Sequence, residues 1–428
     1  WLKRVMLRAC LCRVAPSLPS SRLRALLPAS RGVSMATNGS AITLKDGSNM
    51  RDIFDVCQKH GLPSLAQGMI EFPPPEKLRQ IAADKVMSPQ VHTYRTRMGE
   101  ADYKESIAAL VQNVYKENVS AGNVLATAGV AGAVTAALFH LRKTKPTATV
   151  ALMEPFYTYH SLEVERAFCR PPIVIPDVNG SAMPDWDALK TKVEAGEVHG
   201  VIVTNPLNPS GHVFSTDEVA MLLGLAQSHD LFVIFDECYL DMVFNGKTHA
   251  SPLVNGLRDN VVACRGFSKC MGCQSWRCGY ALSTASTIEG MMRMMDPLYI
   301  CTNWTQHALG EYFVKHTDDF VEHCRSLNEL LQENWRMLSA AFKQKFGWEP
   351  LEPNGTMYGM FKHSDETDIK ACERALQAGV GICPGNVFYG DVASPPARSG
   401  WVRIHCGVAK EKAQAIVAKL AEGPQEGK

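Results

Sequence analysis

Short apolar runs alternate with longer segments of helical spacing through the middle of the chain. The runs fall at residues 123–127, 149–153, 200–204, 231–235, 260–265 and 278–282. Residues 216–228, between two of these runs, repeat their apolar positions at helical spacing. Runs rich in β-branched residues and separated by helices are typical of a parallel sheet buried on both faces. The pattern therefore predicts an α/β fold.

The pattern changes toward the C-terminus. Residues 291–342 have helical spacing, residues 357–362 and 401–406 resemble strands, and residues 410–420 resemble a final helix. We therefore predict a large domain over residues 91–305, with a central, mostly parallel sheet between helices. A smaller α+β C-terminal domain is predicted over residues 306–428. Residues 35–90 are expected to form an N-terminal arm and part of the small domain.

The first part of the chain differs from the rest in charge. No acidic residue precedes Asp46, while residues 1–34 contain seven basic residues and several serines. Such a composition is typical of a mitochondrial transit peptide, and no apolar run is long enough for a secretory signal. We expect residues 1–34 to be this peptide, with cleavage near Arg31. The alternative is a leader that is not part of the protein, and a start at Met35 would give a cytoplasmic form.

The charge of the remaining chain excludes some classes of function. The whole sequence has 44 basic and 43 acidic residues, and without residues 1–34 it has 37 and 43, a net charge of −6. A chain without a basic excess is not expected to bind nucleic acid. The longest uncharged stretch, residues 118–140, is interrupted by glycines and polar residues. A membrane-spanning helix is therefore not predicted.

The 14 cysteines are scattered along the chain. Cys270 and Cys273 form a single CxxC motif, and Cys278 follows it, but no second pair and no histidine stand at ligand spacing. Structural zinc sites usually have four ligands. We therefore predict reduced thiols and no metal, and the role of these three cysteines stays open.

Chemically active residues follow three of the predicted strands. Asn208 lies in a loop with two prolines after residues 200–204, Asp236 follows residues 231–235, and Lys269 follows residues 260–265. Functional groups gather at the carboxyl ends of strands in open α/β sheets. A buried lysine has a lowered pKa and can form a Schiff base. The alternatives are a turn for Asn208 and a helix N-cap for Asp236.

Candidate phosphate ligands lie near the lysine. Ser268 precedes it and Arg277 follows eight residues later, offering a hydroxyl and a fork of N–H donors. Residues 128–133 read Ala-Gly-Val-Ala-Gly-Ala and open an Ala-rich helix, whose N-terminal N–H groups are suited to phosphate. The alternative is a dinucleotide site, but the GxGxxG spacing and its downstream acid are absent.

In this order, over residues 60–410, these motifs resemble the class I/II aminotransferases. The resemblance implies fold type I and the cofactor pyridoxal 5′-phosphate, which serves as an electron sink at the amino acid Cα. Lys269 matches the lysine that binds the cofactor covalently, and Asp236 matches the acid that pairs with its ring nitrogen. Tyr239 and Asn208 match the two groups at the phenolic oxygen of the ring.

The remaining site residues also come from the resemblance. Those matching phosphate contacts are Arg277, Ser268, the backbone of Val130 and Ala131, and Tyr94, which would reach the phosphate across a homodimer interface. Tyr157 matches an aromatic residue stacked on the cofactor ring. Gly68 resembles a glycine lining the substrate site, and Arg403 matches the arginine that binds the substrate α-carboxylate.

The resemblance implies a transaminase that moves the amino group of an α-amino acid to a 2-oxo acid by a ping-pong mechanism. The alternative is a C–S lyase or an aminocyclopropane-carboxylate-synthase-like enzyme, because fold and cofactor do not decide the reaction. The expected partners are the two substrates and a second copy of the chain, without nucleic acid or membrane. The amino acid itself is left open.

Overall fold

The computed structural model describes residues 42–45, 47–94, 96–297, 303–390 and 399–422. These residues belong to one compact unit that begins at Ile42. The predicted transit peptide, the cleavage point near Arg31 and Met35 lie outside the described residues.

The larger of two sheets has seven strands in the order β1-β7-β6-β5-β4-β2-β3. β7 is antiparallel to β1 and β6, and every other adjacent pair is parallel. The mostly parallel central sheet predicted from the sequence is therefore confirmed, with all six predicted strands present and one more, β3. The strands are β1 (Val124–Thr127), β2 (Val150–Met153), β3 (Ile173–Ile175), β4 (Gly200–Thr204), β5 (Phe232–Asp236), β6 (Val261–Gly266) and β7 (Gly279–Leu282).

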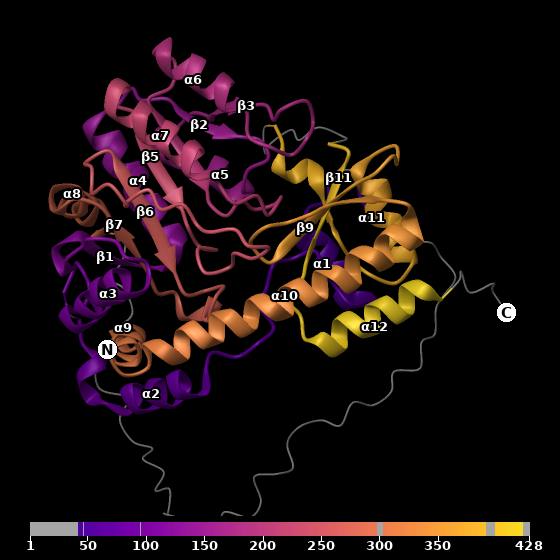
Figure 1. Cartoon of the computed structure of the whole chain (residues 1–428), viewed down its shortest axis with the longest axis horizontal. Coiled ribbons are helices and arrows are strands. Elements are labelled where there is room, and N and C mark those ends of the chain that lie inside the picture. The colour runs from indigo at the N-terminus through magenta and orange to yellow at the C-terminus, as the bar shows by residue number, and fades with distance from the viewer. Residues whose placement is uncertain (1–41, 46, 95, 298–302, 391–398, 423–428) are drawn as a thin grey trace, which may run out of the picture. The chain divides into compact units, whose positions relative to one another are not determined.

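Helices cover both faces of this sheet (Figure 1). On β5, Phe232 and Ile234 pack into the core formed with α4, α5 and α8, while Val233 and Phe235 pack against α6 and α7. Successive strand residues point to opposite faces, so a strand buried on both faces is apolar throughout. On β1 and β7, the face opposite α4 packs on α2, α3 and α9. The helices are α2 (Glu76–Met87), α3 (Ala101–Val114), α4 (Gly129–Thr144), α5 (Thr158–Phe168), α6 (Trp186–Glu194), α7 (Thr216–His229), α8 (Ala285–Met295) and α9 (Asn303–Lys315).

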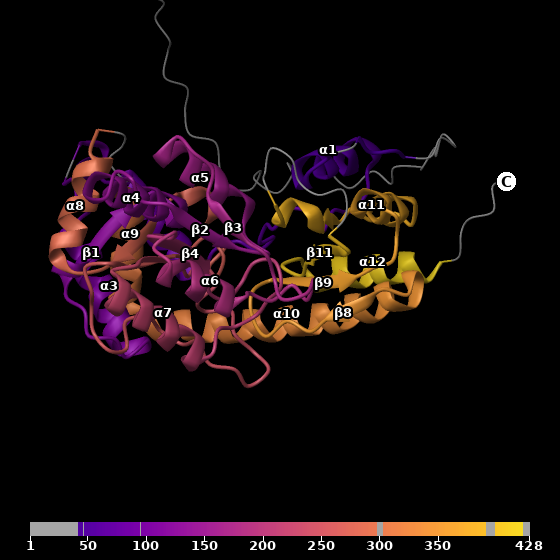
Figure 2. The same ribbon diagram turned by 90° about the horizontal axis from the view of Figure 1, so that it is seen from above.

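The smaller sheet has four antiparallel strands in the order β10-β11-β9-β8. The predicted strands near residues 357–362 and 401–406 correspond to β9 and β11, whereas β8 and β10 are short and were not predicted. Figure 2 shows α1, α11 and α12 around these strands. The elements are β8 (Glu349–Leu351), β9 (Tyr358–Lys362), β10 (Cys383–Pro384), β11 (Trp401–His405), α1 (Met50–His60), α10 (Thr317–Phe346), α11 (Asp368–Gln377) and α12 (Lys410–Ala421).

The 30-residue helix α10 contributes to both cores (Figure 1). Phe320 and Cys324 pack with α9, whereas Leu331 and Trp335 pack in the core of the smaller sheet, which also contains Ile53 of α1. The exact domain boundaries proposed from the sequence remain predictions. Four short 3-10 helices complete the described elements: η1 (Pro89–His92), η2 (Ala121–Asn123), η3 (Gln274–Trp276) and η4 (Gly385–Phe388).

Among the helices of the described residues, none combines the length and the apolar character needed to cross a membrane.

Candidate active site

Asp236 is a buried carboxylate at the end of β5, with 5% of its surface exposed. Its Oδ2 lies 3.0 Å from Nε2 of the buried His160, and its Oδ1 accepts a hydrogen bond of 3.1 Å from the backbone N–H of Cys238. The ring of Tyr157, just before α5, meets the His160 ring edge-on at 5.3 Å. A carboxylate in this position is costly unless paired, and His160 of α5 is a partner that the sequence did not reveal.

Lys269 lies three residues after the end of β6, in a turn. Its side chain is half-buried, and its Nζ donates a 2.8 Å hydrogen bond to the backbone carbonyl of Gly68. Cys238 is close enough to both Asp236 and Lys269 for their charges to act on it. Burial raises the pKa of the Cys238 thiol well above its usual range. The structure thus brings the lysine and the acid predicted from two different strand ends to one place.

Tyr239 and Tyr358 form a buried pair beside Gly68. The two hydroxyl oxygens lie 3.2 Å apart, and burial raises the pKa of Tyr239 well above its usual range. A Cβ atom on Gly68 would lie 1.9 Å from the Tyr358 hydroxyl oxygen, so this position requires glycine. Tyr358, at the start of β9, belongs to the site although the sequence analysis did not select it.

Arg403 of β11 is 1% exposed and lies over the face of Tyr358, with its guanidinium carbon 4.1 Å from the ring centre. Its two terminal amino groups donate hydrogen bonds of 2.8 Å to Oδ1 of Asn208 and to the carbonyl of Ala66. Its Nε is buried without a hydrogen-bond partner, and no carboxylate pairs with it among the described residues. A buried charge without a counter-charge favours an anionic ligand.

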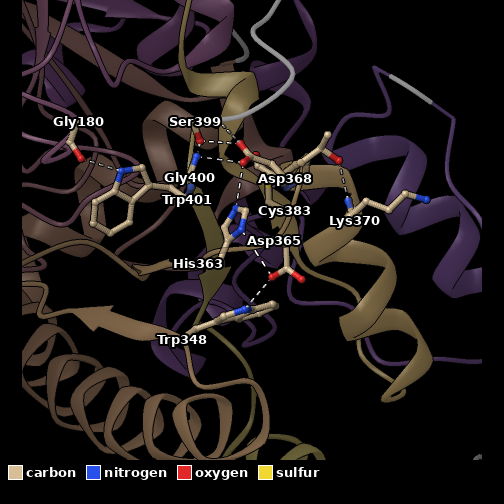
Figure 3. A network of polar contacts seen from close by, with 12 residues as sticks. Gly180, Trp348, His363, Asp365, Asp368, Lys370, Cys383, Ser399, Gly400 and Trp401 are labelled. Carbon is tan, nitrogen blue, oxygen red and sulfur yellow. Dashed lines mark hydrogen bonds and ion pairs between the residues drawn. The ribbon is translucent and has the colours of Figure 1, made fainter.

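A buried network fixes the start of the strand that carries Arg403 (Figure 3). Both oxygens of the fully buried Asp368 accept hydrogen bonds: Oδ1 from the Gly400 N–H at 3.1 Å, and Oδ2 from the Ser399 hydroxyl at 2.6 Å. His363 directly follows β9, the strand paired with β11. Its Nε2 atom lies 2.9 Å from Oδ1 of Asp368. Each oxygen of the carboxylate is thereby occupied, so the backbone entering β11 is rigidly positioned.

The N-terminus of α4 meets Arg277 next to the lysine turn. Gly129, the first residue of α4, has a φ of 73°, and a Cβ there would lie 2.7 Å from a guanidinium nitrogen of Arg277. Arg277 is exposed and donates hydrogen bonds of 2.9 Å to the Ala128 carbonyl and 3.1 Å to the Gln274 carbonyl. No side chain caps α4. The first N–H groups of the helix therefore face an arginine, an arrangement suited to an anion.

The other residues predicted to contact the phosphate differ in their solvent exposure. Ser268 is half-buried in the lysine turn, and Val130 and Ala131 belong to the first turn of α4, with Ala131 exposed. Val130 packs 3.3 Å from the Cβ position of Gly266, so it lies against the end of β6. The Tyr94 side chain is 92% exposed, so within one chain its ring is left in solvent.

Comparison with known proteins identifies the family of this chain. The family described as aminotransferase class I and II matches residues 62–420. The chain belongs to the class I and II aminotransferases. It is therefore an enzyme of a family whose members use pyridoxal phosphate to transfer amino groups.

Three relatives illustrate the similarity. The aspartate aminotransferase of Thermotoga maritima is 23% identical over 361 residues, covering 84% of this aminotransferase and 90% of the relative. The structure of N-succinyldiaminopimelate aminotransferase from Mycobacterium tuberculosis matches with a TM-score of 0.78 and 23% identity, covering 89% of this chain and 99% of that one. YbdL from Escherichia coli, described with a methionine aminotransferase function, matches with a TM-score of 0.77 and 22% identity over 89% and 99% of the two chains. The two structures share the fold type I architecture with this aminotransferase.

Sequence reasoning missed residues whose role depends on distant contacts. His160 lies three positions after Tyr157, and Tyr358 starts a strand that was predicted for its apolar pattern. The Ala66 carbonyl and the Phe388 ring, 4.6 Å from the Arg403 guanidinium, complete the surroundings of the arginine. The position of His160, three residues after Tyr157, was the only local signal of a site residue. No local signal pointed to Tyr358, Ala66 or Phe388.

Proposed function

We propose that this aminotransferase binds pyridoxal 5′-phosphate at Lys269 and moves the amino group of an α-amino acid to a 2-oxo acid by a ping-pong mechanism. The observation that carries the proposal is the convergence of a half-buried lysine, a buried carboxylate and a buried arginine that has no carboxylate partner among the described residues.

The residues present fit the cofactor. The uncapped N-terminus of α4, the Arg277 guanidinium and the Ser268 hydroxyl would hold the phosphate. Gly129 supports this assignment, because a Cβ there would collide with the guanidinium. Asp236, oriented by His160, would hold the protonated ring nitrogen. When bound, the cofactor supplies an electron sink for the carbanion formed at Cα of the substrate.

Other residues would contact the ring of the cofactor. Tyr239 and Asn208 are assigned to its phenolic oxygen, and Tyr157 to its face. Tyr239 is buried and Tyr157 is half-buried. Burial raises the pKa of both tyrosine hydroxyls. Each tyrosine is therefore a neutral hydrogen-bond donor at neutral pH. Neutral donors at an anionic ring oxygen stabilise its charge without transferring their own proton.

The chain's own residues would then move protons and hold the substrate. The free amine of Lys269, held near Gly68, would carry the proton between Cα of the substrate and C4′ of the cofactor. Arg403 binds the α-carboxylate with the N–H donors that Asn208 and Ala66 leave unused. Gly68 lets the Tyr358 hydroxyl lie close to its backbone, because a Cβ there would be 1.9 Å from the hydroxyl oxygen.

The named relatives support an α-amino acid substrate. Their names include aspartate, N-succinyldiaminopimelate and methionine, compounds that differ in the side chain and share the α-amino carboxylate. Arg403 and Lys269 would bind this shared part.

The test is an assay of the purified protein with pyridoxal phosphate. Aspartate, methionine and an aromatic amino acid are each offered with 2-oxoglutarate or pyruvate. Transfer of the amino group to the oxo acid, at a rate that depends on both substrates with ping-pong kinetics, is the expected result. Release of an oxo acid and ammonia without an acceptor would instead indicate the lyase alternative.

Two further proposals concern the protein in the cell. We propose a homodimer in which Tyr94 of one chain reaches the phosphate of the other, because its ring is 92% exposed in the single chain. We also propose that residues 1–34 direct the protein to mitochondria and that a form starting at Met35 stays in the cytoplasm. Sedimentation tests the first proposal, and the location of fluorescent fusions with and without residues 1–34 tests the second.

A further inference from the structure

Three potential metal ligands converge behind the lysine turn. One carboxylate oxygen of Asp241 and the Sγ atoms of Cys270 and Cys324 all lie within 4.8 Å of one another. They come from three segments: the turn after β5, the residue following Lys269, and the N-terminal part of α10. The tertiary structure therefore pairs Cys270 with Cys324, and not with Cys273, its partner in the CxxC motif.

The two thiols are shielded and lie close together. Cys270 is 2% exposed and Cys324 is 9% exposed. Their Sγ atoms lie within 4.8 Å of each other, and Cys270 Sγ also lies 3.9 Å from the Gly266 carbonyl oxygen. Cys273 makes a different contact, because its Sγ lies 3.6 Å from the Met271 carbonyl. Neutral thiols held at this spacing become thiolate ligands once a metal displaces their protons.

The surroundings of Asp241 contain more acidic than basic groups. The fully buried Arg265 is already bound by Glu117, through two hydrogen bonds of 2.7 Å, and by Glu237 at 2.6 Å. His249 also lies 3.0 Å from Glu237. Arg265 and His249 act on Asp241 only through their charge, without a direct ion pair among the described residues. A cation at Asp241 would offset this excess of carboxylates.

The carboxylate is also oriented by a second contact. The Tyr115 hydroxyl donates a 2.7 Å hydrogen bond to Oδ1 of Asp241. Hydrogen bonds from outer residues commonly orient metal ligands and are nearly as important as the ligands themselves. Two sulfurs and one carboxylate oxygen are a donor set that suits zinc and similar borderline cations better than magnesium or calcium.

We propose that Asp241, Cys270 and Cys324 form a binding site for one zinc-class divalent cation. On binding, the two thiols lose their protons to solvent and two metal–sulfur bonds form, so no oxidant or reductant is needed. The fourth position is filled by water. The bound cation links the Lys269 turn to α10 and to the turn after β5.

The test uses the full chain with pyridoxal phosphate bound. The protein is kept reduced and is freed of metal before zinc ions are added. Zinc retained after gel filtration is measured by elemental analysis, and alkylation of individual cysteines is measured by mass spectrometry. The wild type is expected to retain one zinc ion per chain, with Cys270 and Cys324 alkylated more slowly than in the metal-free protein until a chelator is added. Asp241→Asn, Cys270→Ala and Cys324→Ala should each weaken binding about tenfold or more, while Cys273→Ala serves as the matched control and should bind normally.

Three outcomes would overturn the proposal. The first is zinc binding that is equal in the wild type and in the Cys324→Ala variant. The second is binding that is lost in His307→Ala instead, because Glu100, Asp102 and His307 form another cluster of suitable side chains. The third is protection of the two cysteines that a reductant reverses and a chelator does not, which would indicate a disulfide. The alkylation pattern of the wild type decides the matter even if a ligand variant fails to fold.

Discussion

Replacement of Arg403 by lysine tests the proposed carboxylate site most directly. Arg403 is buried on all sides, with Asn208, the Ala66 carbonyl and the Tyr358 ring around it. A lysine keeps the positive charge but has no planar fork, so it cannot bind Asn208, Ala66 and both oxygens of a substrate carboxylate together. The substitution therefore removes the planar fork of N–H donors and retains the positive charge.

The magnitude follows from the hydrogen bonds lost. We assume that lysine makes one charge-assisted hydrogen bond fewer to the substrate carboxylate than Arg403 does. Such a hydrogen bond is worth about 1.5–3 kcal/mol. At about 1.4 kcal/mol per factor of ten, kcat/KM for an α-amino acid should fall roughly 10- to 150-fold. Cofactor binding should change much less than this, because the hydrogen bonds of Arg403 reach only Asn208 among the residues assigned to the cofactor and none of the residues assigned to its phosphate.

The assay compares each amino acid with the amine that lacks its carboxylate. For the wild type the acid is the better substrate, and in Arg403→Lys this preference should shrink by the same 10- to 150-fold while the rate with the amine stays constant. Visible absorbance of the bound cofactor and the Tm serve as controls for folding. Equal loss with the acid and the amine would show that Arg403 acts only through the fold, and an unchanged preference would refute the assignment.

Three further predictions concern the lysine, the acid and a neighbouring glutamate. Lys269→Ala should remove the visible absorbance of the bound cofactor and lower kcat by about 10²–10⁴, while far-UV circular dichroism stays unchanged; a wild-type spectrum would contradict the assignment. Asp236→Asn should also lower kcat strongly, yet leave the α-carboxylate preference intact, which separates its role from that of Arg403. Burial raises the pKa of Glu163 from 4.5 to about 7, so its protonated form favours the folded state, and this stability is fully present below pH 4.5 and is lost as the pH rises from there to about 7. Glu163→Gln should therefore have a higher Tm than the wild type at about pH 8 and the same Tm at about pH 4; an equal difference at both pH values would exclude this explanation.

The local pattern was sufficient for the elements that are buried on two faces. β4 and β5 are buried at every residue, because α4 and α5 cover one face and α6 and α7 the other. A strand of this kind has no polar face and is visible as a continuous apolar run. β3, β8 and β10 have two or three residues, and their pairing partners define them more than their own sequences do.

The sequence by itself determined where six of the large sheet's seven strands lie along the chain, and the strand ends that carry Asn208, Asp236 and Lys269. Those positions follow from chain-local patterns, since an apolar run ends where the polar residue begins. Only the tertiary structure decided that His160 meets Asp236, that Tyr358 lies under Arg403, and that Cys270 faces Cys324. These pairs join segments separated by tens of residues, and no local periodicity encodes which side chains will share one buried volume.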